Sequence, residues 1–272
     1  MNIDTLKQEE KSTVTSQVNT EERVLKFTLS CPHFHMTEET SNENVIETYR
    51  NPHKLAILGM LGNMLGLKGY NNKTFSKSKS IYPEWYEKLQ DLKVAVVNNS
   101  ETGTFISAVN EYSNTTGLHE ADGNTLLIKE NWLYNTSWTV YVLGDNKIID
   151  EIADRMENRK YNGMLYLGKS QHYVEKIKDA ERISLEDMKR IDEDNLTTRI
   201  DSLFIDKDIE VKRAMFGSNG TFEFIQRMPV KFRKNTVYYF KEMMKWTDKE
   251  VVIRNAKENN FYKYQDKIIQ FI

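Results

Sequence analysis

Residues 51–67 have the sequence Asn-Pro-His-Lys-Leu-Ala-Ile-Leu-Gly-Met-Leu-Gly-Asn-Met-Leu-Gly-Leu. Proline in the first turn and aliphatic residues at positions 55, 58, 61 and 65 predict a helix. Glycines at 59, 62 and 66 each cost a helix about 1 kcal/mol relative to alanine. Their presence favours a helix that packs closely against a sheet or another backbone.

The segment before this helix has a strand pattern. Leu25, Phe27 and Leu29 fall on one face of a short strand over 24–30, which we expect to stop at Pro32 because proline has no backbone N–H. Residues 1–22 are polar, without sustained periodicity, and predict a flexible N-terminal arm.

The segments after the helix alternate between strand and helix patterns. Apolar periodicity predicts a short helix over 83–89, strands over 92–97 and 138–143, and a second helix over 147–158. The polar, turn-rich stretch 98–136 predicts a projecting hairpin, the thumb. This is the order of an α+β, RRM-like or ferredoxin-like β-α-β-β-α-β domain, expected over 23–182, with a small β-rich region over 183–272.

Composition narrows the class of protein. The chain has 272 residues and a formal net charge of -2, typical of a globular protein without an overall basic footprint. Its one cysteine, Cys31, cannot form an intramolecular disulfide and favours a reducing compartment. Neither a basic and apolar leader nor a long apolar segment is found, so we expect a cytoplasmic protein with no membrane association.

The basic residues are unevenly distributed. Residues 48–82 contain six lysines and arginines and no acid, and residues 227–245 contain six against Glu242 alone. Such segregation is expected where one face meets a polyanion, but solvated surfaces also have this composition.

Two constellations could carry metal or acid–base chemistry. Cys31, His33 and His35 alternate along an extended segment, but no second cluster supplies a fourth zinc ligand, so we expect a polar strand end and neither metal nor cofactor. A ribonuclease would need a base and a phosphate-binding cation, such as His53 with Lys54. Lysines often fall near histidines by chance, so structural or RNA-contacting roles are favoured over a catalytic one.

The segment Tyr166-Leu167-Gly168-Lys169-Ser170 ends an apolar stretch with a flexible backbone, a cation and a hydroxyl. These groups suit a phosphate-binding turn, and they equally suit a tight turn that closes a hairpin. Both interpretations stay open at this point.

Several of these segments resemble one family. Residues 27–30 and 51–67 are similar to the opening strand and the Pro-x6-Gly-Met-Leu helix of the Cas-five proteins, RAMP-superfamily subunits of type I CRISPR surveillance complexes (Cascade), in particular the I-B-like branch. Residues 166–170 resemble the family's Tyr-Leu-Gly-Lys-Ser turn, and Met228-Pro229-Val230 resembles its Leu-Pro-Val strand.

The resemblance implies a non-catalytic subunit in antiviral defence that binds the 5′ handle of the CRISPR RNA (crRNA). Implied partners are the backbone subunit, which the thumb would meet, the large subunit and the crRNA-processing subunit. The residues that we expect to contact the handle are basic or polar members of the segments described above: Arg50, Lys54, Lys68, Lys73, Lys169, Ser170 and His172.

Two other functions remain open. The family commonly has Ser or Thr near positions 55 and 56, where this chain has Leu55 and Ala56, and it usually begins near the first strand. A homologue that enters the host Cascade and inhibits it, an anti-CRISPR decoy, would need the same docking face. Relatives that cleave precursor RNA use a tyrosine, a lysine and an adjacent histidine, but this sequence contains no Lys-His dipeptide.

Overall fold

The computed structural model describes residues 22–39, 44–70, 80–114, 126–211 and 222–272. The expected flexible arm lies outside the described residues, apart from Glu22, and so does Lys73.

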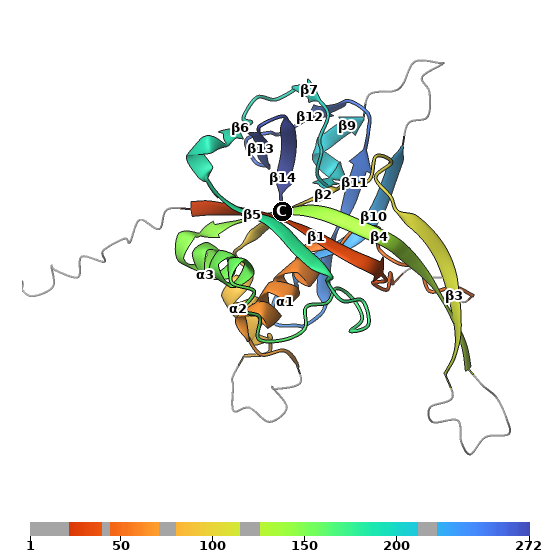
Figure 1. Cartoon of the computed structure of the whole chain (residues 1–272). Coiled ribbons are helices and arrows are strands. Elements are labelled where there is room, and N and C mark those ends of the chain that lie inside the picture. Colours follow the sequence, from red (N-terminus) through yellow and green to blue (C-terminus); the bar gives the residue numbers. More distant parts are fainter. Residues whose placement is uncertain (1–21, 40–43, 71–79, 115–125, 212–221) are drawn as a thin grey trace, which may run out of the picture.

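The centre of the fold is an antiparallel sheet with the strand order β2-β4-β1-β5. It contains β1 (Glu22–Phe34), β2 (Lys93–Asn98), β4 (Leu126–Asp145) and β5 (Lys176–Ser184). The outer half of the long strand β4 pairs with β3 (Ile106–Asn114), and the β3–β4 hairpin projects far from the body (Figure 1).

Three helices lie on one face of this sheet (Figure 1): α1 (Lys54–Leu65), α2 (Glu84–Leu89) and α3 (Asn146–Glu157). Leu25, Phe27 and Leu29 are fully buried in the same core as the apolar side chains of these helices, as their alternation predicted. On the opposite face, Val24 and Tyr141 pack with apolar residues of two C-terminal strands. Helices cover one face of the antiparallel sheet and strands cover the other. The chain therefore has the predicted mixed α+β class.

The remaining strands form three small antiparallel sheets. The first contains β8 (Phe204–Ile205), β10 (Glu223–Phe232) and β11 (Tyr239–Thr247). The second contains β7 (Thr197–Thr198), β9 (Ile209–Val211) and β12 (Val251–Ile253). The third contains β6 (Lys189–Arg190), β13 (Asn260–Tyr264) and β14 (Lys267–Phe271). The last residue, Ile272, exchanges backbone hydrogen bonds with Val94 of β2, which attaches the third sheet to the central one.

The predicted strand end at Pro32 is wrong, because β1 continues to Phe34. The β1–β5 pairing ends at Ser30, whereas the β1–β4 pairing continues to Phe34. Beyond Ser30 the strand therefore has one partner, and the missing N–H of Pro32 falls where a second ladder is no longer required.

Close packing of α1 is confirmed at one glycine and not at another. A Cβ atom at Gly62 would lie 2.3 Å from Cβ of Trp85 on α2, whereas one at Gly59 would have no neighbour closer than 4.0 Å. Gly62 thus allows the two helices to touch.

These two glycines predict opposite effects of the same substitution. Gly62→Ala is expected to lower the free energy of unfolding by about 1–3 kcal/mol, since Trp85 must move. Gly59→Ala is expected to raise it by about 0.5–1 kcal/mol, because alanine is the better helix former. Urea denaturation of the two variants measures the difference. Equal effects of the two substitutions would contradict the close contact.

Candidate nucleic-acid interface

A cavity of about 700 Å³ opens between α1, the turn around Gly168 and the β10–β11 hairpin. Aromatic side chains contribute much of its lining: Tyr49, Tyr70, Trp85, Tyr166 and Tyr239. Polar groups come from Thr37, Glu39, His53, Asn63 and Lys169. We call this cavity the groove. Its volume lies in the range of ligand pockets and accommodates a nucleotide.

His53 caps the N-terminus of α1 at the edge of the groove. Its Nδ1 atom accepts a hydrogen bond from the backbone N–H of Ala56 at 3.1 Å, which satisfies one of the exposed amides at the start of the helix. Burial, with a smaller effect of Lys241, lowers the pKa of His53 to about 3. The imidazole is therefore neutral and carries its proton on Nε2. Because its only lone pair holds the cap, His53 can donate a hydrogen bond to a ligand but cannot act as a general base.

A row of aromatic rings extends from His53 to Tyr82 through Tyr239 and Phe232 of the β10–β11 hairpin. The ring centroids are 6.3 Å apart between His53 and Tyr239, 5.5 Å between Tyr239 and Phe232, and 5.9 Å between Phe232 and Tyr82. The last two pairs are nearly parallel, with interplanar angles of 13°. Tyr239 is 38% exposed and Tyr70 is 44% exposed. Such rings offer faces on which unpaired bases stack without sequence preference.

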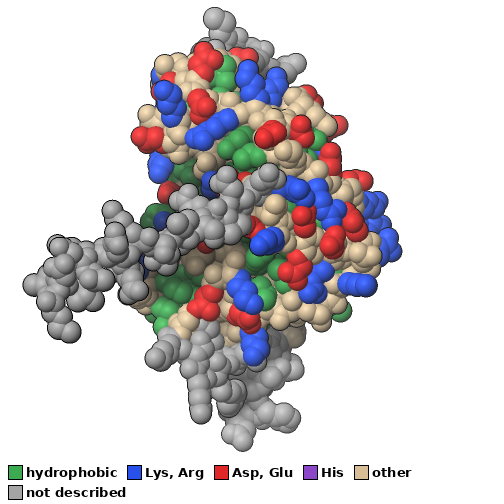
Figure 2. All heavy atoms as spheres, turned by 90° about the vertical axis from the view of Figure 1, so that its left-hand side faces the viewer, with side chains coloured by type: hydrophobic (Ala, Val, Ile, Leu, Met, Phe, Trp, Pro, Cys, Tyr) green, Lys and Arg blue, Asp and Glu red, His purple; other side chains and the backbone are tan. Residues whose placement is uncertain are grey.

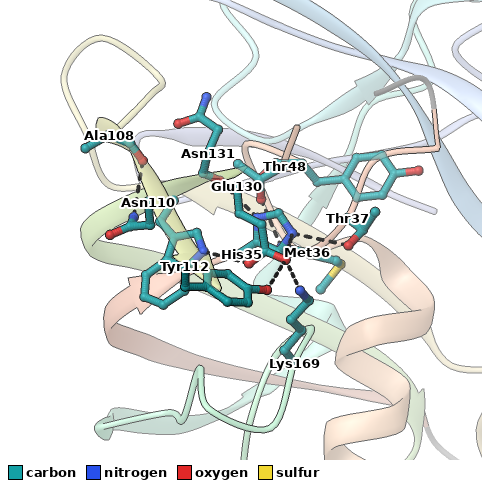
Figure 3. Close-up of polar contacts among 12 residues, drawn as sticks. His35, Met36, Thr37, Thr48, Ala108, Asn110, Tyr112, Glu130, Asn131 and Lys169 are labelled. Carbon is teal, nitrogen blue, oxygen red and sulfur yellow. Dashed lines mark hydrogen bonds and ion pairs between the residues drawn. The ribbon is translucent and has the colours of Figure 1, made fainter. Parts of the chain in front are cut away.

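A buried carboxylate lies beside the groove at the base of the β3–β4 hairpin (Figure 3). Glu130 is fully buried and accepts hydrogen bonds from Tyr112 Oη at 2.9 Å, from Trp132 Nε1 at 3.0 Å, and from Lys169 Nζ. Burial alone would raise the pKa of Glu130, but the hydrogen bonds from Lys169, Trp132 and Tyr112 hold it below its usual value. The side chain is thus an ionised, fully bonded carboxylate.

His35 completes this polar cluster. Its Nδ1 lies 2.9 Å from the carbonyl oxygen of Asn131 and must donate, so a neutral ring leaves Nε2 to accept from the Thr37 hydroxyl at 3.2 Å. Burial lowers the pKa of His35, which agrees with a neutral ring.

The sequence family described as CRISPR-associated protein (Cas_Cas5) matches residues 24–242, four fifths of the chain. The chain belongs to the Cas5 family. No curated protein matches it. A chain of a solved "CRISPR RNA-guided surveillance complex" is 13% identical to this Cas5 protein, with a TM-score of 0.46, over 84% of this chain and 91% of that one. A CRISPR protein from Archaeoglobus fulgidus is 10% identical, with a TM-score of 0.43, over 90% of this chain and 98% of that one.

The residues expected to contact RNA do not share one surface of this Cas5 chain. Arg50 is exposed and donates to the Thr104 hydroxyl at 2.8 Å, and Lys68 and Ser170 are also exposed. Lys54 lines a separate small cavity with Val94 and Met228, where burial lowers its pKa to about 8. Lys73 lies outside the described residues.

The expected turn at residues 166–170 is present, and the backbone N–H of His172 donates to the carbonyl oxygen of Lys169. The expected apolar strand before it is reduced to two isolated bridges, Tyr166 with Tyr173 and Gly168 with His35. Lys169 lines the groove but is paired with Glu130. His172 is fully buried, 2.9 Å from the imidazole of His33, and burial, together with His33 and His35, lowers its pKa to about 4. A buried ring offers no atom to RNA, so we do not propose a contact between His172 and the handle.

The Cys31, His33 and His35 segment has the character of a packed strand end. Burial raises the pKa of Cys31 to about 12, so it is a protonated thiol. Within the residues that the structure describes, no group of three or more His, Cys, Asp or Glu side chains is arranged to hold a metal ion. None of the described helices has the length and apolarity needed to cross a membrane.

Another face of the Cas5 chain carries both basic and acidic side chains, which form ion pairs with one another. Figure 2 shows blue and red side chains interspersed on the side where β1 begins. There Arg182 forms ion pairs with Asp150, Asp154 and Glu157, and Arg23 pairs with Asp150 at 2.6 Å. A face neutralised in this way attracts a polyanion weakly.

Sequence reasoning missed Glu130 and the cap made by His53. Glu130 lies in a polar, turn-rich stretch, and nothing in its spacing marks it as buried. The cap could have been recognised, because His53 directly precedes the helix that begins at Lys54, although histidine is not among the preferred capping residues.

Proposed function

We propose that this Cas5 chain is a non-catalytic subunit of a type I, I-B-like CRISPR surveillance complex and holds the 5′ handle of the crRNA in the groove. The observation that carries the proposal is the groove, where exposed aromatic faces border the N-terminus of a helix and the turn at Gly168. Splayed single-stranded RNA is bound by this combination of stacking surfaces, backbone dipoles and hydrogen-bond donors.

The polar contacts that we propose come from exposed members of the expected set. Arg50, Lys68 and Ser170 are exposed, and Lys73 belongs to the same basic run as Lys68. Cations at the edge of a stacking surface position the phosphates, while the rings hold the bases. The near-neutral net charge of the chain fits a protein that binds RNA more tightly within an assembly than alone.

The geometry supports a role without RNA cleavage. The lone pair of His53 is used by the helix cap, and Tyr49, whose pKa is raised by burial, donates its hydroxyl to the carbonyl oxygen of Arg227 at 3.3 Å. The Tyr49 hydroxyl proton and the His53 lone pair are therefore both used within the fold, and Lys54 does not line the groove. These three residues therefore do not form an acid–base pair beside a phosphate-binding cation, which supports the proposal.

For the organisation of the chain we propose an RRM-like RAMP domain over 23–182, a β-rich C-terminal region over 183–272 and a flexible arm over 1–22. The β3–β4 hairpin is proposed to meet the neighbouring backbone subunit. The large subunit and the crRNA-processing subunit are further proposed partners.

Co-expression tests this function. A tagged chain would be expressed with an I-B CRISPR array and the remaining Cascade subunits, and the co-purified RNA and proteins would be sequenced and identified. We expect Cascade proteins together with RNAs that share one 5′ handle. Recovery of neither would refute the proposal. Plasmid interference in the same cells distinguishes a working subunit from an inhibitory one.

The aromatic faces predict a specific loss of RNA affinity. Tyr239→Ala is expected to weaken binding of the handle RNA by about 1–3 kcal/mol, roughly 5-fold to 150-fold, because one stacking surface is lost. Tyr238→Ala is the control, since Tyr238 is 74% exposed on the same hairpin and does not line the groove. Fluorescence anisotropy with labelled handle RNA measures both. Equal losses for the two variants would contradict stacking in the groove.

A further inference from the structure

Glu130 differs from every other acidic residue that the structure describes, because it alone is buried. A buried carboxylate is costly unless it is paired and hydrogen-bonded. Here its oxygens are bonded by side chains from three segments: Tyr112 on β3, Trp132 on β4 and Lys169 in the turn before β5. The cluster therefore joins both strands of the projecting hairpin to the rim of the groove.

The turn that carries Lys169 is also attached through its backbone. Gly168 has φ +79°, and a Cβ atom there would lie 2.2 Å from the carbonyl oxygen of His35. Gly168 and His35 form a parallel bridge, so the turn lies directly on the end of β1. The buried side chains of Leu167 and His172 anchor the turn to the body of the protein, and the ion pair adds the link between the turn and the hairpin.

Two roles for Lys169 follow from this geometry. If it were a phosphate ligand, Glu130 would compete with RNA for the same ammonium group. If it were a cross-link, Glu130 would hold the turn in place, and RNA would meet the backbone and the Ser170 hydroxyl. The second role agrees with the burial of Glu130, since breaking a buried pair leaves an uncompensated charge.

We propose that Glu130 is a positioning residue that acts through Lys169, fixing the turn at the rim of the groove and coupling it to the β3–β4 hairpin. Lys169 then contributes a cross-link and no phosphate contact. The proposal deepens the function proposed above and rests on it where RNA binding is the readout.

Glu130→Gln can be compared with a matched variant. Glu111→Gln removes the same charge from the same hairpin. It is a suitable control because Glu111 is about half exposed and its ion pair with Lys129, at 3.1 Å, lies at the surface. If charge alone matters, both variants bind RNA slightly more tightly. Under the proposal, Glu130→Gln lowers affinity at least tenfold, and Glu111→Gln stays within twofold of the unchanged protein.

The salt dependence separates the two roles of Lys169. The probe is synthetic RNA with the handle sequence recovered in the co-expression experiment, bound to the full-length chain. A lost phosphate contact lowers the slope of log K against log salt by about 0.7 for a single strand. We expect Lys169→Gln to weaken binding without changing this slope. A slope reduced by about 0.7, with Glu130→Gln binding as tightly as Glu111→Gln, would overturn the proposal.

Hydrogen exchange provides a test that needs no RNA. Glu130→Gln and Lys169→Gln are both expected to increase amide exchange across residues 166–173, whereas Glu111→Gln is not. If the complex recovered by co-expression contains no handle RNA, the proposed function fails, and exchange alone decides the positioning role. Equal exchange of the turn in all variants would overturn it. Lys169→Gln leaves the hairpin residues intact and keeps the test valid if Glu130→Gln does not fold.

Discussion

Replacing Asn51 with leucine is expected to lower the free energy of unfolding by about 2–4 kcal/mol. Asn51 is fully buried three residues before the start of α1, and its Oδ1 accepts from Trp138 Nε1 at 2.9 Å and from Asn98 Nδ2 at 2.8 Å. Leucine has a similar size but no acceptor, so two buried N–H groups lose a partner. Chemical denaturation monitored by tryptophan fluorescence measures the loss.

A double-mutant cycle isolates the hydrogen bond from packing effects. Trp138→Phe removes the indole N–H that Asn51 satisfies, so Asn51→Leu should cost less in the phenylalanine background, by about 1–2 kcal/mol. Additive effects of the two substitutions would show that the bond contributes nothing. A loss below 1 kcal/mol for Asn51→Leu alone would contradict the buried network.

Replacing Lys54 with methionine is expected to stabilise the protein at neutral pH by about 1–3 kcal/mol. Lys54 shares its small cavity with apolar side chains, and burial, only partly opposed by Asp91, lowers its pKa to about 8. The folded state therefore carries the cost of a poorly solvated ammonium group at pH 7. Methionine has nearly the same length and no charge. Lys68→Met, at an exposed lysine, is the control and should change stability little.

The lowered pKa of Lys54 also predicts how the stability of the protein varies with pH. Because the pKa of Lys54 is lower in the folded chain than its ordinary 10.5, the unfolded chain binds more protons between about pH 8 and 10.5, and stability rises with pH in this window. Lys54→Met should lack this rise. Burial raises the pKa of Tyr49 and Tyr141, which lowers stability only above about pH 10, so the difference between the two proteins isolates Lys54. Parallel pH profiles for the two proteins would contradict the lowered pKa of Lys54.

Local sequence patterns predicted those features that depend on neighbouring residues, such as the buried face of β1 and the close packing of α1. Leu25, Phe27 and Leu29 alternate because one face of β1 is buried, and the glycines of α1 predicted the contact that Gly62 makes with Trp85. The end of β1 was misjudged because the effect of Pro32 depends on how many strands pair with it there, which is a property of the whole sheet.

The candidate site could be predicted only in part, because its chemistry depends on contacts between distant segments. Glu130 and Lys169 are 39 residues apart, and neither sequence context indicates an ion pair. Lys54 follows His53 directly, and both line the small cavity, yet only His53 also lines the groove. A basic run in the sequence therefore does not define a basic surface.

The position of β1 has a consequence for synthesis of the chain. It is the first described strand to leave the ribosome, yet both of its neighbours, β4 and β5, come from residues 126–184. At about 5–20 residues per second, its two edges and the side chains of Leu25, Phe27 and Leu29 await their partners for roughly 5–30 seconds. The nascent protein is therefore exposed to aggregation until β5 is made, and early engagement by a chaperone would raise its yield.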